Sequence, residues 1–250
     1  MNAARIVVER GSDGVDHARV LAPSATLAPR PVYSADGVTR IALVGVSMTL
    51  LSGDRVEVDV EVVNGAAVEI VEPAAVVAHR AVDASSWAIR GAVSDGGALL
   101  WAGSPMIAAE GCIVHRTLEL DLHPGARTLM RETLVRGRNG EQGGRLTSRT
   151  LAGELLREEL EVGTPMSGTP SILGSAKVMD SITALGWRPQ AAIEEPEVAV
   201  LELEGPGRIV RALDAAAAVP GSRLARIYAA WRGELASRYA ARTDQHPLLS

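Results

Sequence analysis

The chain contains no phenylalanine, and aromatic residues make up only 3% of its 250 residues. Its core must therefore be built from Val, Leu, Ile and Ala, whose small or branched side chains suit tightly stacked β-sheets. Exposed aromatic faces are the usual platform for sugars and for single-stranded nucleic acid. Their scarcity argues against both of these binding functions.

Cysteine and stretches of basic residues are equally scarce. Cys112 is the only cysteine, which excludes an internal disulfide framework and a zinc site of the multi-cysteine type. The formal net charge is −5, and no window of the sequence supplies a basic face free of interleaved carboxylates. Because phosphate backbones require such a face, we expect no nucleic-acid partner.

Long apolar runs are also missing. Residues 1–11 carry scattered charges and do not resemble a signal peptide. No stretch approaches the roughly 20 apolar residues that a membrane-spanning helix needs. These absences predict a cytoplasmic protein without a membrane partner.

The sequence is rich in alternating segments, and its length predicts a single domain over residues 1–250. In residues 54–64, valines occupy every second position and charged residues occupy the positions between them, a pattern typical of a half-buried strand. The pair Asn64-Gly65 follows, and both residue types tolerate positive φ, so this pair predicts a hairpin. We expect the returning strand to begin near Val68 and to end at Pro73.

The same pattern recurs in residues 98–101, 112–122 and 126–135, with Gly96-Gly97 and Pro124-Gly125 as turns between them. Strands at about ten-residue spacing indicate a mainly β fold, in the form of a stack, a sandwich or a solenoid. No fixed repeat length is visible, so the sequence does not favour a regular solenoid.

Two segments leave their secondary structure open. Residues 151–162 carry leucines near helical spacing, but Gly153 interrupts them and neighbouring threonine and valine residues favour a strand. The segment 163–188 is mixed in character, and residues 175–185 within it are compatible with a short helix.

The end of the chain changes character. Residues 198–203 and 208–213 have strand patterns, and after Pro220 apolar residues recur at intervals of three and four. This spacing predicts an amphipathic helix, so that C-terminal strands and a helix occupy residues 198–242. We expect the tail, residues 243–250, to be frayed.

The usual catalytic constellations are absent from the sequence. It contains no nucleophile elbow, phosphate loop, zinc-protease motif or dinucleotide fingerprint, and its five histidines are scattered singly. Cys112 and His115 lie three positions apart, which places them on opposite faces of a strand. His115 and His123 share a face but lie ~26 Å apart. We therefore expect no enzyme and no tight metal site.

Two ordered sets of residues carry more specific information. Residues 51–60 (LSGDRVEVDV) are followed by residues 64–67 (NGAA), and residues 124–126 (PGA) are followed by residues 131–141 (RETLVRGRNGE). These resemble the UreD family of urease accessory proteins, called UreH in some organisms. The family has a Gly-Gly-Asp turn, an alternating strand and a Gly-Ala hairpin, and further on a strand ending in Glu followed by Gly-Arg and Gly-Glu.

Between these two sets, residues 97–101 (GALLW) and 104–107 (SPMI) stand where the family has a Gly-Ala motif and a Pro-rich motif. The order holds over residues 32–162. The resemblance implies a stacked or flattened β-sheet scaffold of many short strands with a few α-helices. It also implies a hairpin at Gly153.

The resemblance further implies a non-catalytic role in urease maturation. Proteins of this family bind UreF, which recruits the GTPase UreG, and they also contact the urease apoprotein. The assembly delivers nickel to the urease active site, and an internal water-filled passage is the route proposed for the family. No tightly bound cofactor is implied, only nickel(II) in transit.

The resemblance singles out particular residues. The candidates for contact with a partner or with nickel in transit are Glu132, Arg138, Glu141, Asp54 and Asp59. The residues of the structural motif are Gly53, Gly65, Pro105, Gly137 and Gly140. Our hypothesis is that Glu132 and Glu141 face the passage or a partner surface, and that Arg138 fixes the intervening turn.

Two other functions remain open. The first is a β-rich protein-interaction module unrelated to urease. The second is a β-helical enzyme acting on an acidic polysaccharide, which requires carboxylates or arginines clustered on one strand face and usually requires export.

Overall fold

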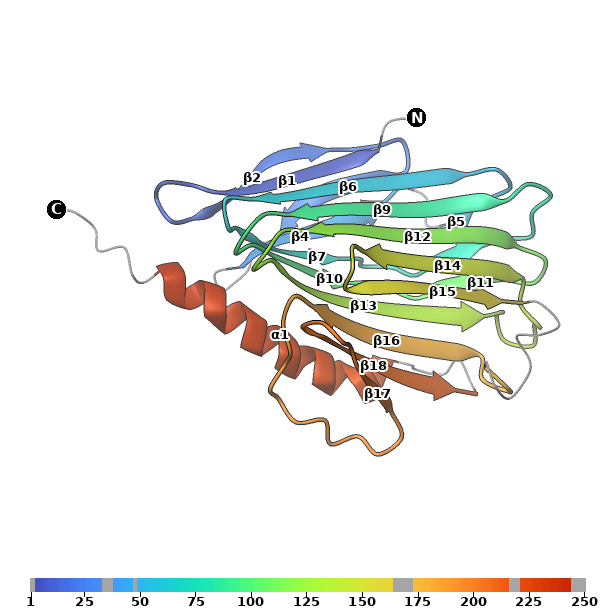
Figure 1. The fold of residues 1–250 in the computed structure, drawn as a ribbon. Coiled ribbons are helices and arrows are strands. Elements are labelled where there is room, and N and C mark those ends of the chain that lie inside the picture. Colours follow the sequence, from blue (N-terminus) through green and yellow to red (C-terminus); the bar gives the residue numbers. More distant parts are fainter. Residues whose placement is uncertain (1–2, 33–37, 47–48, 164–172, 216–220, 244–250) are drawn as a thin grey trace.

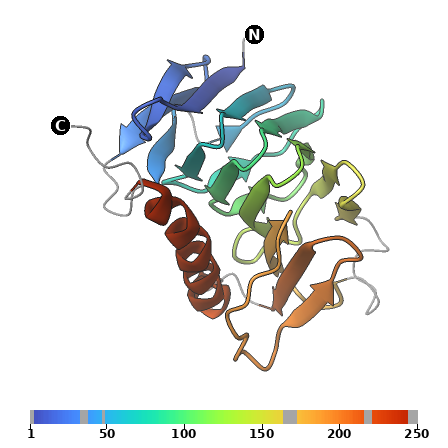
Figure 2. The same cartoon turned by 60° about the vertical axis from the view of Figure 1, so that its left-hand side comes forward.

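The computed structural model describes residues 3–32, 38–46, 49–163, 173–215 and 221–243. Two β-sheets lie face to face, and one long helix packs on the outer face of one of them (Figures 1 and 2). In the order of pairing, sheet A contains β15 (Leu156–Val162), β14 (Arg145–Ala152), β12 (Ile113–Leu122), β9 (Ser85–Val93), β6 (Arg55–Val63), β1 (Ala4–Arg10) and β2 (Asp16–Ala22).

In the described part of the chain, sheet B contains eleven strands. Its main path is β17 (Ala199–Glu202), β18 (Gly207–Asp214), β16 (Val178–Leu185), β13 (Arg127–Arg136), β10 (Ala98–Ala102), β7 (Ala67–Val71), β4 (Thr39–Gly45) and β3 (Leu27–Val32). The short strands β5 (Thr49–Leu50), β8 (Val76–Ala78) and β11 (Met106–Ala108) extend the sheet beside β13. The expected mainly β, stacked-sheet fold is therefore confirmed.

The middle of the molecule winds like a short solenoid, in which successive strands belong alternately to sheet A and to sheet B. The chain passes from β6 in sheet A to β7 in sheet B, then from β9 to β10, and then from β12 to β13. Ala98 pairs in parallel with Ala67, 31 positions earlier, and with Arg127, 29 positions later. Successive windings of the chain thus contain similar but unequal numbers of residues. This is why the sequence shows no fixed repeat length.

The turn at Asn64-Gly65 has the expected backbone but not the expected role. Both residues have positive φ, 56° and 72°, and the amide of Ala66 donates to the carbonyl of Val63 at 3.1 Å. However, β6 pairs with β1 and β9, whereas β7 pairs with β4 and β10. The predicted hairpin is wrong, because the same tight turn here carries the chain across the corner between two facing sheets.

Two other predicted elements can be compared with the structure. Residues 151–162 form an antiparallel hairpin at Gly153 between β14 and β15, as the resemblance implied. Residues 175–185 are not a helix, because most of them form β16, which is hydrogen-bonded on both edges by β13 and β18. The tail 244–250 lies outside the described residues.

The space between the sheets is filled by small apolar side chains. The four inward-facing valines of β6, at positions 56, 58, 60 and 62, are each at most 3% exposed. Burying a side chain of this kind stabilises a fold by roughly 1.5 kcal/mol or more. Facing valine, isoleucine and leucine residues of sheet B complete this core, and Trp87 and Trp101 are its large members.

Helix α1 (Gly221–Thr243) is the one helix of the described residues, where a few were expected. It covers the outer face of sheet B with Leu224, Trp231 and Leu235, all 0% exposed. Near the far end of the helix, the hydroxyl of Tyr239 donates to the carbonyl of Gly96 at 3.1 Å. Apolar packing therefore fixes the helix along much of its length.

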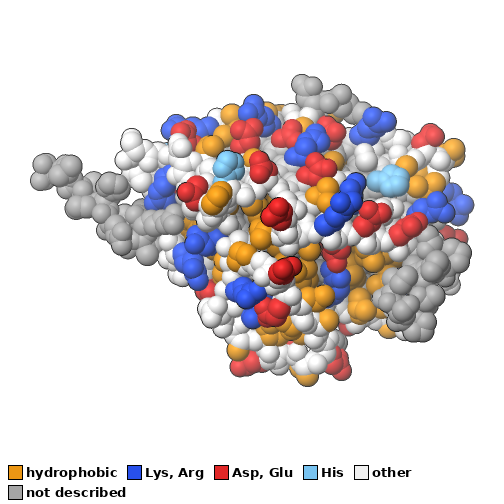
Figure 3. Space-filling view, in the orientation of Figure 1, with side chains coloured by type: hydrophobic (Ala, Val, Ile, Leu, Met, Phe, Trp, Pro, Cys, Tyr) orange, Lys and Arg blue, Asp and Glu red, His pale blue; other side chains and the backbone are white. Residues whose placement is uncertain are grey.

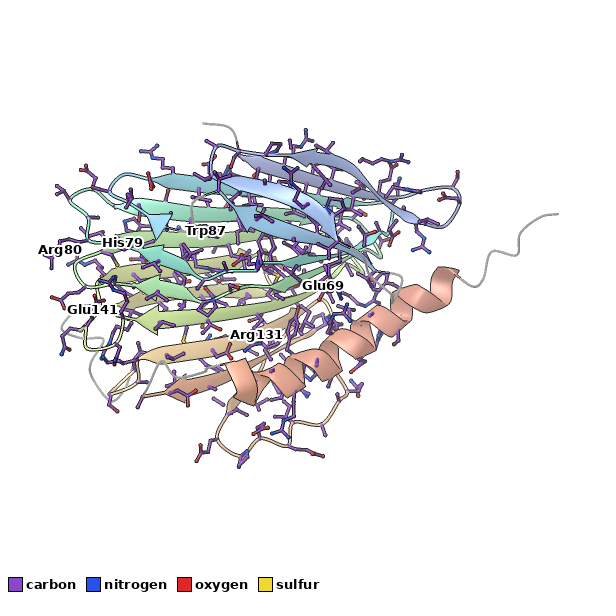
Figure 4. The ribbon with its side chains drawn as sticks, turned by 180° about the vertical axis from the view of Figure 1, so that it is seen from behind. Glu69, His79, Arg80, Trp87, Arg131 and Glu141 are labelled. Carbon is purple, nitrogen blue, oxygen red and sulfur yellow. The ribbon has the colours of Figure 1, made fainter. Side chains whose placement is uncertain are left out.

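A buried carboxylate also attaches this helix to the sheet. Glu69 of β7 is 3% exposed and accepts hydrogen bonds at 2.7 Å from Arg40 of β4 and from Arg232 of α1 (Figure 4). Burial opposes ionisation of Glu69, but the bonds from Arg232 and Arg40 outweigh it and lower the pKa of this carboxyl. Glu69 thus remains charged and holds two cations from separate elements.

We expect Glu69→Gln to lower the free energy of unfolding by roughly 2–3 kcal/mol, because both guanidinium groups lose their counter-charge in a buried place. The matched control is Glu61→Gln, whose pair with Arg5 is 52% and 43% exposed and should cost less than about 0.5 kcal/mol. Urea unfolding followed by circular dichroism measures both changes. Equal losses in the two variants would contradict the role given to Glu69.

Candidate functional site

One ion pair lies inside the sandwich, at positions where the strand pattern calls for apolar side chains. Arg116 of β12 and Glu132 of β13 both point into the space between the sheets, and their Nη1 and Oε1 atoms are 2.6 Å apart. The side chains are 10% and 20% exposed. The hydroxyl of Ser148 donates to the same Glu132 oxygen at 3.4 Å. The pair therefore connects sheet A to sheet B through charge.

A second ion pair connects the same two sheets closer to solvent. Nη2 of Arg211, on β18, lies 2.9 and 3.0 Å from the two carboxylate oxygens of Glu158, on β15. Nε of Arg211 donates to the hydroxyl of Ser181 at 3.0 Å. Arg211 is 20% and Glu158 36% exposed, so this pair stands at the side of the sandwich.

An enclosed cavity lies between these two pairs. The volume available to the centre of a water-sized molecule within it is about 20 Å³, which is room for roughly one water. Its polar lining comes from Arg116, Arg131, Glu132, Thr150, Glu158, Ser181, Thr183 and Arg211. Its remaining lining is largely apolar and includes Trp101, Leu118, Leu120, Met130, Leu156 and Leu185.

Behind Trp101 lies a further carboxyl group. Glu72 accepts hydrogen bonds from the indole nitrogen of Trp101 at 2.8 Å and from the amide of Ser104 at 3.0 Å. Burial raises the pKa of Glu72, while these bonds and the charge of Arg116 act in the opposite direction. The polar groups of the interior thus extend from Glu158 at the side of the sandwich towards Glu72.

Arg138 and Glu141 form a closed turn at the ends of the strands. Nε of Arg138 donates to Glu141 at 2.8 Å, and the amides of Arg138 and Glu110 donate to the other carboxylate oxygen at 2.9 and 3.1 Å (Figure 4). The hydrogen bonds from Arg138 lower the pKa of Glu141 to about 2. These contacts engage both oxygens of Glu141 in holding the turn.

The two aspartates singled out from the sequence lie away from the cavity. Asp54 accepts from the amide of Leu51 at 2.8 Å and closes the turn before β6. Asp59 lies on the outer face of sheet A, where it accepts from Nε of Arg90 at 3.0 Å. Of the five candidates for partner or passage contact, Glu132 alone lines the inter-sheet cavity.

The residues of the structural motif lie in turns and at a strand start. Gly53, Gly65, Gly137 and Gly140 have φ between 72° and 81°, in the left-handed region that favours glycine. A Cβ at Gly137 would lie 2.8 Å from the amide nitrogen of Gly143. The carbonyl of Pro105 accepts from the amide of Val76 at 2.9 Å, directly before β11.

The outer face of sheet A offers a second hollow, of about 500 Å³ (Figure 3). Its charged lining consists of Arg5, Asp59, Glu61, Arg90, Glu119 and Asp121. Charges of both signs are present there, as is usual for a solvated sheet face. The inter-sheet cavity is the stronger candidate, because charge is costly between two apolar layers and ordinary on an exposed face.

Arg116, Glu158 and Arg211 were not singled out from the sequence. A usable signal was nevertheless present, since each stands at an inward position of its strand. Arg116 lies between Val114 and Leu118 in the inward phase of β12. Glu158 likewise lies between Leu156 and Leu160 in β15. A charged residue in the apolar phase of a strand is the feature that points to the interior.

The described residues offer no ready metal centre. Among them, no three His, Cys, Asp or Glu side chains come together in a way that could hold a metal ion. Cys112 is buried and His115 is exposed on the opposite face of the strand, as predicted. In the same described part of the chain, no helix has the length and apolar character to span a membrane.

Comparison with known proteins places these features in a family. The family model described as "UreD urease accessory protein" matches residues 3–245. Urease accessory protein UreD 1 of Streptomyces griseus is 42% identical over 236 residues, covering 92% of this chain and 91% of the relative. Urease accessory protein UreD of Streptomyces coelicolor is 32% identical, with coverage of 84% and 89%. The UreD protein of a Parafrankia species is 30% identical, with coverage of 84% and 82%.

The turn at Glu141 generates a pH prediction. The folded pKa of about 2 lies below the ordinary value of 4.5, so the stabilisation is fully present above about pH 4.5 and is lost as pH falls through about 2. We expect the Glu141 carboxyl carbon to show no titration in NMR spectra between pH 6 and 3. In the Arg138→Gln variant, the titration of the Glu141 carboxyl should move up into that pH range. An unchanged titration in the variant would rule out Arg138 as the cause.

Proposed function

This chain belongs to the UreD family of urease accessory proteins, and on that premise we propose that it is a non-catalytic scaffold for nickel delivery to apo-urease. In this proposal it works in the cytoplasm with UreF and, through UreF, with the GTPase UreG. It also contacts the urease apoprotein. Nickel(II) is its cargo in transit, and it holds no resident cofactor.

The observation that supports this role most strongly is the charged pair Arg116–Glu132 between two apolar layers. Apolar residues of similar size at such a place often leave a fold equally stable or more stable. The pair is therefore poorly explained by stability alone. A polar track through the scaffold gives it a function, because a hydrated cation cannot move along a purely apolar lining.

The kind of ligand in the cavity also suits transit. Histidine and cysteine clusters bind nickel tightly, whereas single carboxylates bind it weakly enough for release. Glu132 is a single carboxylate with hydroxyl groups around it. We propose that Glu132 faces the nickel route. Glu141, which is engaged by its own turn, contributes by holding the strand ends in place, as part of a partner surface.

A second candidate function is a β-rich interaction module without a nickel role. The hollow on the outer face of sheet A favours it, because its mixed charges offer many polar contacts to a partner protein. The two candidate functions differ in what they predict for urease.

Expression of the urease operon in a urease-free host with nickel, with and without this gene, tests the proposed function. We expect the nickel content and the activity of purified urease to collapse when this chain is missing. Metal content by mass spectrometry is the primary measurement. Normal filling of urease without this chain would refute the maturation role and favour the interaction module.

The same system tests the two glutamates. We expect Glu132→Ala and Glu141→Ala to lower nickel per urease, and Glu132→Gln to do so without a change in side-chain size. Glu159→Ala is the matched control, since Glu159 is 63% exposed and points out of the sandwich. Circular dichroism verifies that each variant is folded. If both glutamate variants fill urease to the wild-type level, the assignment of these residues fails.

A further inference from the structure

The size of the inter-sheet cavity conflicts with passage of a hydrated ion. The space open to water centres is about 20 Å³. On the same measure a single water takes roughly 10–15 Å³, so an ion that keeps six waters needs on the order of 60–90 Å³. If a divalent cation passes between the sheets, as the proposed function requires, the cavity must therefore open.

The side of the sandwich between β15 and β18 is the place where opening is easiest. Among the strands that the structure describes, β15 is the edge strand of sheet A and pairs with β14 alone. Its charged inward-facing side chain is Glu158, which is flanked by the partly buried residues Leu156 and Leu160. An edge strand with one hydrogen-bonded neighbour moves at a lower free-energy cost than a central strand.

A continuous set of polar groups leads inward from this side. Glu158 and Arg211 stand at the rim, Ser181 and Thr150 follow, and Glu132 lies behind them. The other walls are largely leucine, methionine and tryptophan side chains. This side therefore offers a hydrated cation oxygen atoms that can replace its waters, whereas the apolar walls do not.

In the closed arrangement each carboxylate of the rim and the cavity is occupied by an arginine. Arg211 holds both oxygens of Glu158, and Arg116 holds Glu132. A cation that binds Glu158 must displace Arg211, which weakens the contact between the two sheets at the same time. Metal approach and opening are thus the same event.

From these observations we propose that the Glu158–Arg211 ion pair is the gate of the inter-sheet cavity. It closes the mouth between β15 and β18 and opens when a divalent cation exchanges with the guanidinium group at Glu158. This inference rests on the proposed function, because it assigns the mouth and the gate of the route through the scaffold.

Access to the cavity can be measured without nickel. In a Cys112→Ser background, Thr150→Cys places a thiol on the cavity wall, directly opposite Glu158 in the register of β14 and β15. Adding Arg211→Gln should speed its reaction with an uncharged maleimide about tenfold or more, since a hydrogen bond to a charged group is lost. The carboxylate left at Glu158 disfavours a thiolate nearby, so faster labelling cannot arise from thiol ionisation.

The matched control is Arg149→Gln, which breaks a 4.0 Å pair with Glu159 on the same two strands but on the outer face. It should leave the labelling rate unchanged. The swapped variant, Glu158→Arg with Arg211→Glu, should restore slow labelling. Equal rates in Arg211→Gln and in its parent, or fast labelling in the swapped variant, would overturn the gate.

An assay of nickel delivery then distinguishes a failure of the proposed gate from a failure of the proposed function on which the gate rests. A chain with Glu158→Cys and Arg211→Cys in the Cys112→Ser background is cross-linked between these two positions by a reducible bismaleimide and assayed with the partner proteins and apo-urease. Cross-linking should abolish delivery, and reduction of the linker should restore it. Delivery by the cross-linked chain at the level of the reduced chain would overturn the gate. Delivery that is independent of the wild-type chain would instead overturn the proposed function.

Discussion

Charge held between two apolar layers is the constraint on which the rest of this structure depends. Arg116 and Glu132 lose much of their hydration, and their 2.6 Å contact recovers only part of that free energy. The surrounding sheets must supply the remainder through packing. The inward valines of β6 and the residues facing them form a continuous core around the pair. The fold can therefore carry an interior polar site only because both layers are otherwise apolar.

The outer face of sheet B also carries buried carboxylates, but there a helix packs on that face. Glu69 and Asp180 are buried there, 3% and 0% exposed, and each is held by arginine. Burial raises the pKa of Asp180, and hydrogen bonds from Arg131 and Thr133 offset this only in part. Helix α1 covers the Glu69 cluster and supplies Arg232 to it. Charge on this face fixes a helix, whereas charge between the sheets lines a small cavity.

Much of the local structure could be predicted from the sequence, because a period of two is a property of a single strand. The strand over residues 54–64 and the opposite faces of Cys112 and His115 follow from it. Sheet membership could not be predicted in this way. Asn64-Gly65 supplies the same positive φ values to a hairpin and to a corner between sheets, so pairing depends on distant strands. The short helix that the sequence allows for residues 175–185 does not form, because a central position in a sheet outweighs a weak local preference.

Only part of the candidate site could likewise be predicted from the sequence. Glu132 was identified through the family motif, but its partner Arg116 was not, although it interrupts the apolar phase of its own strand. Glu158 and Arg211 were not identified from the sequence for a further reason: their ion pair joins β15 to β18, which belong to different sheets. Local patterns identify inward charges, and only the fold shows which of them meet.

Pairing with arginine, finally, makes weak metal binding possible in a dry interior. A bare buried carboxylate would either take up a proton or hold a dication strongly, because little water competes with it. A neighbouring guanidinium group offers a competing partner of fixed charge, so the metal binds only by exchange and can leave by the reverse exchange. In the proposed route, Glu158–Arg211 at the rim and Glu132–Arg116 behind it are two such sites, one after the other. Transit requires sites of this kind, whereas a cluster of ligands without counter-charges would bind the metal ion too tightly to release it.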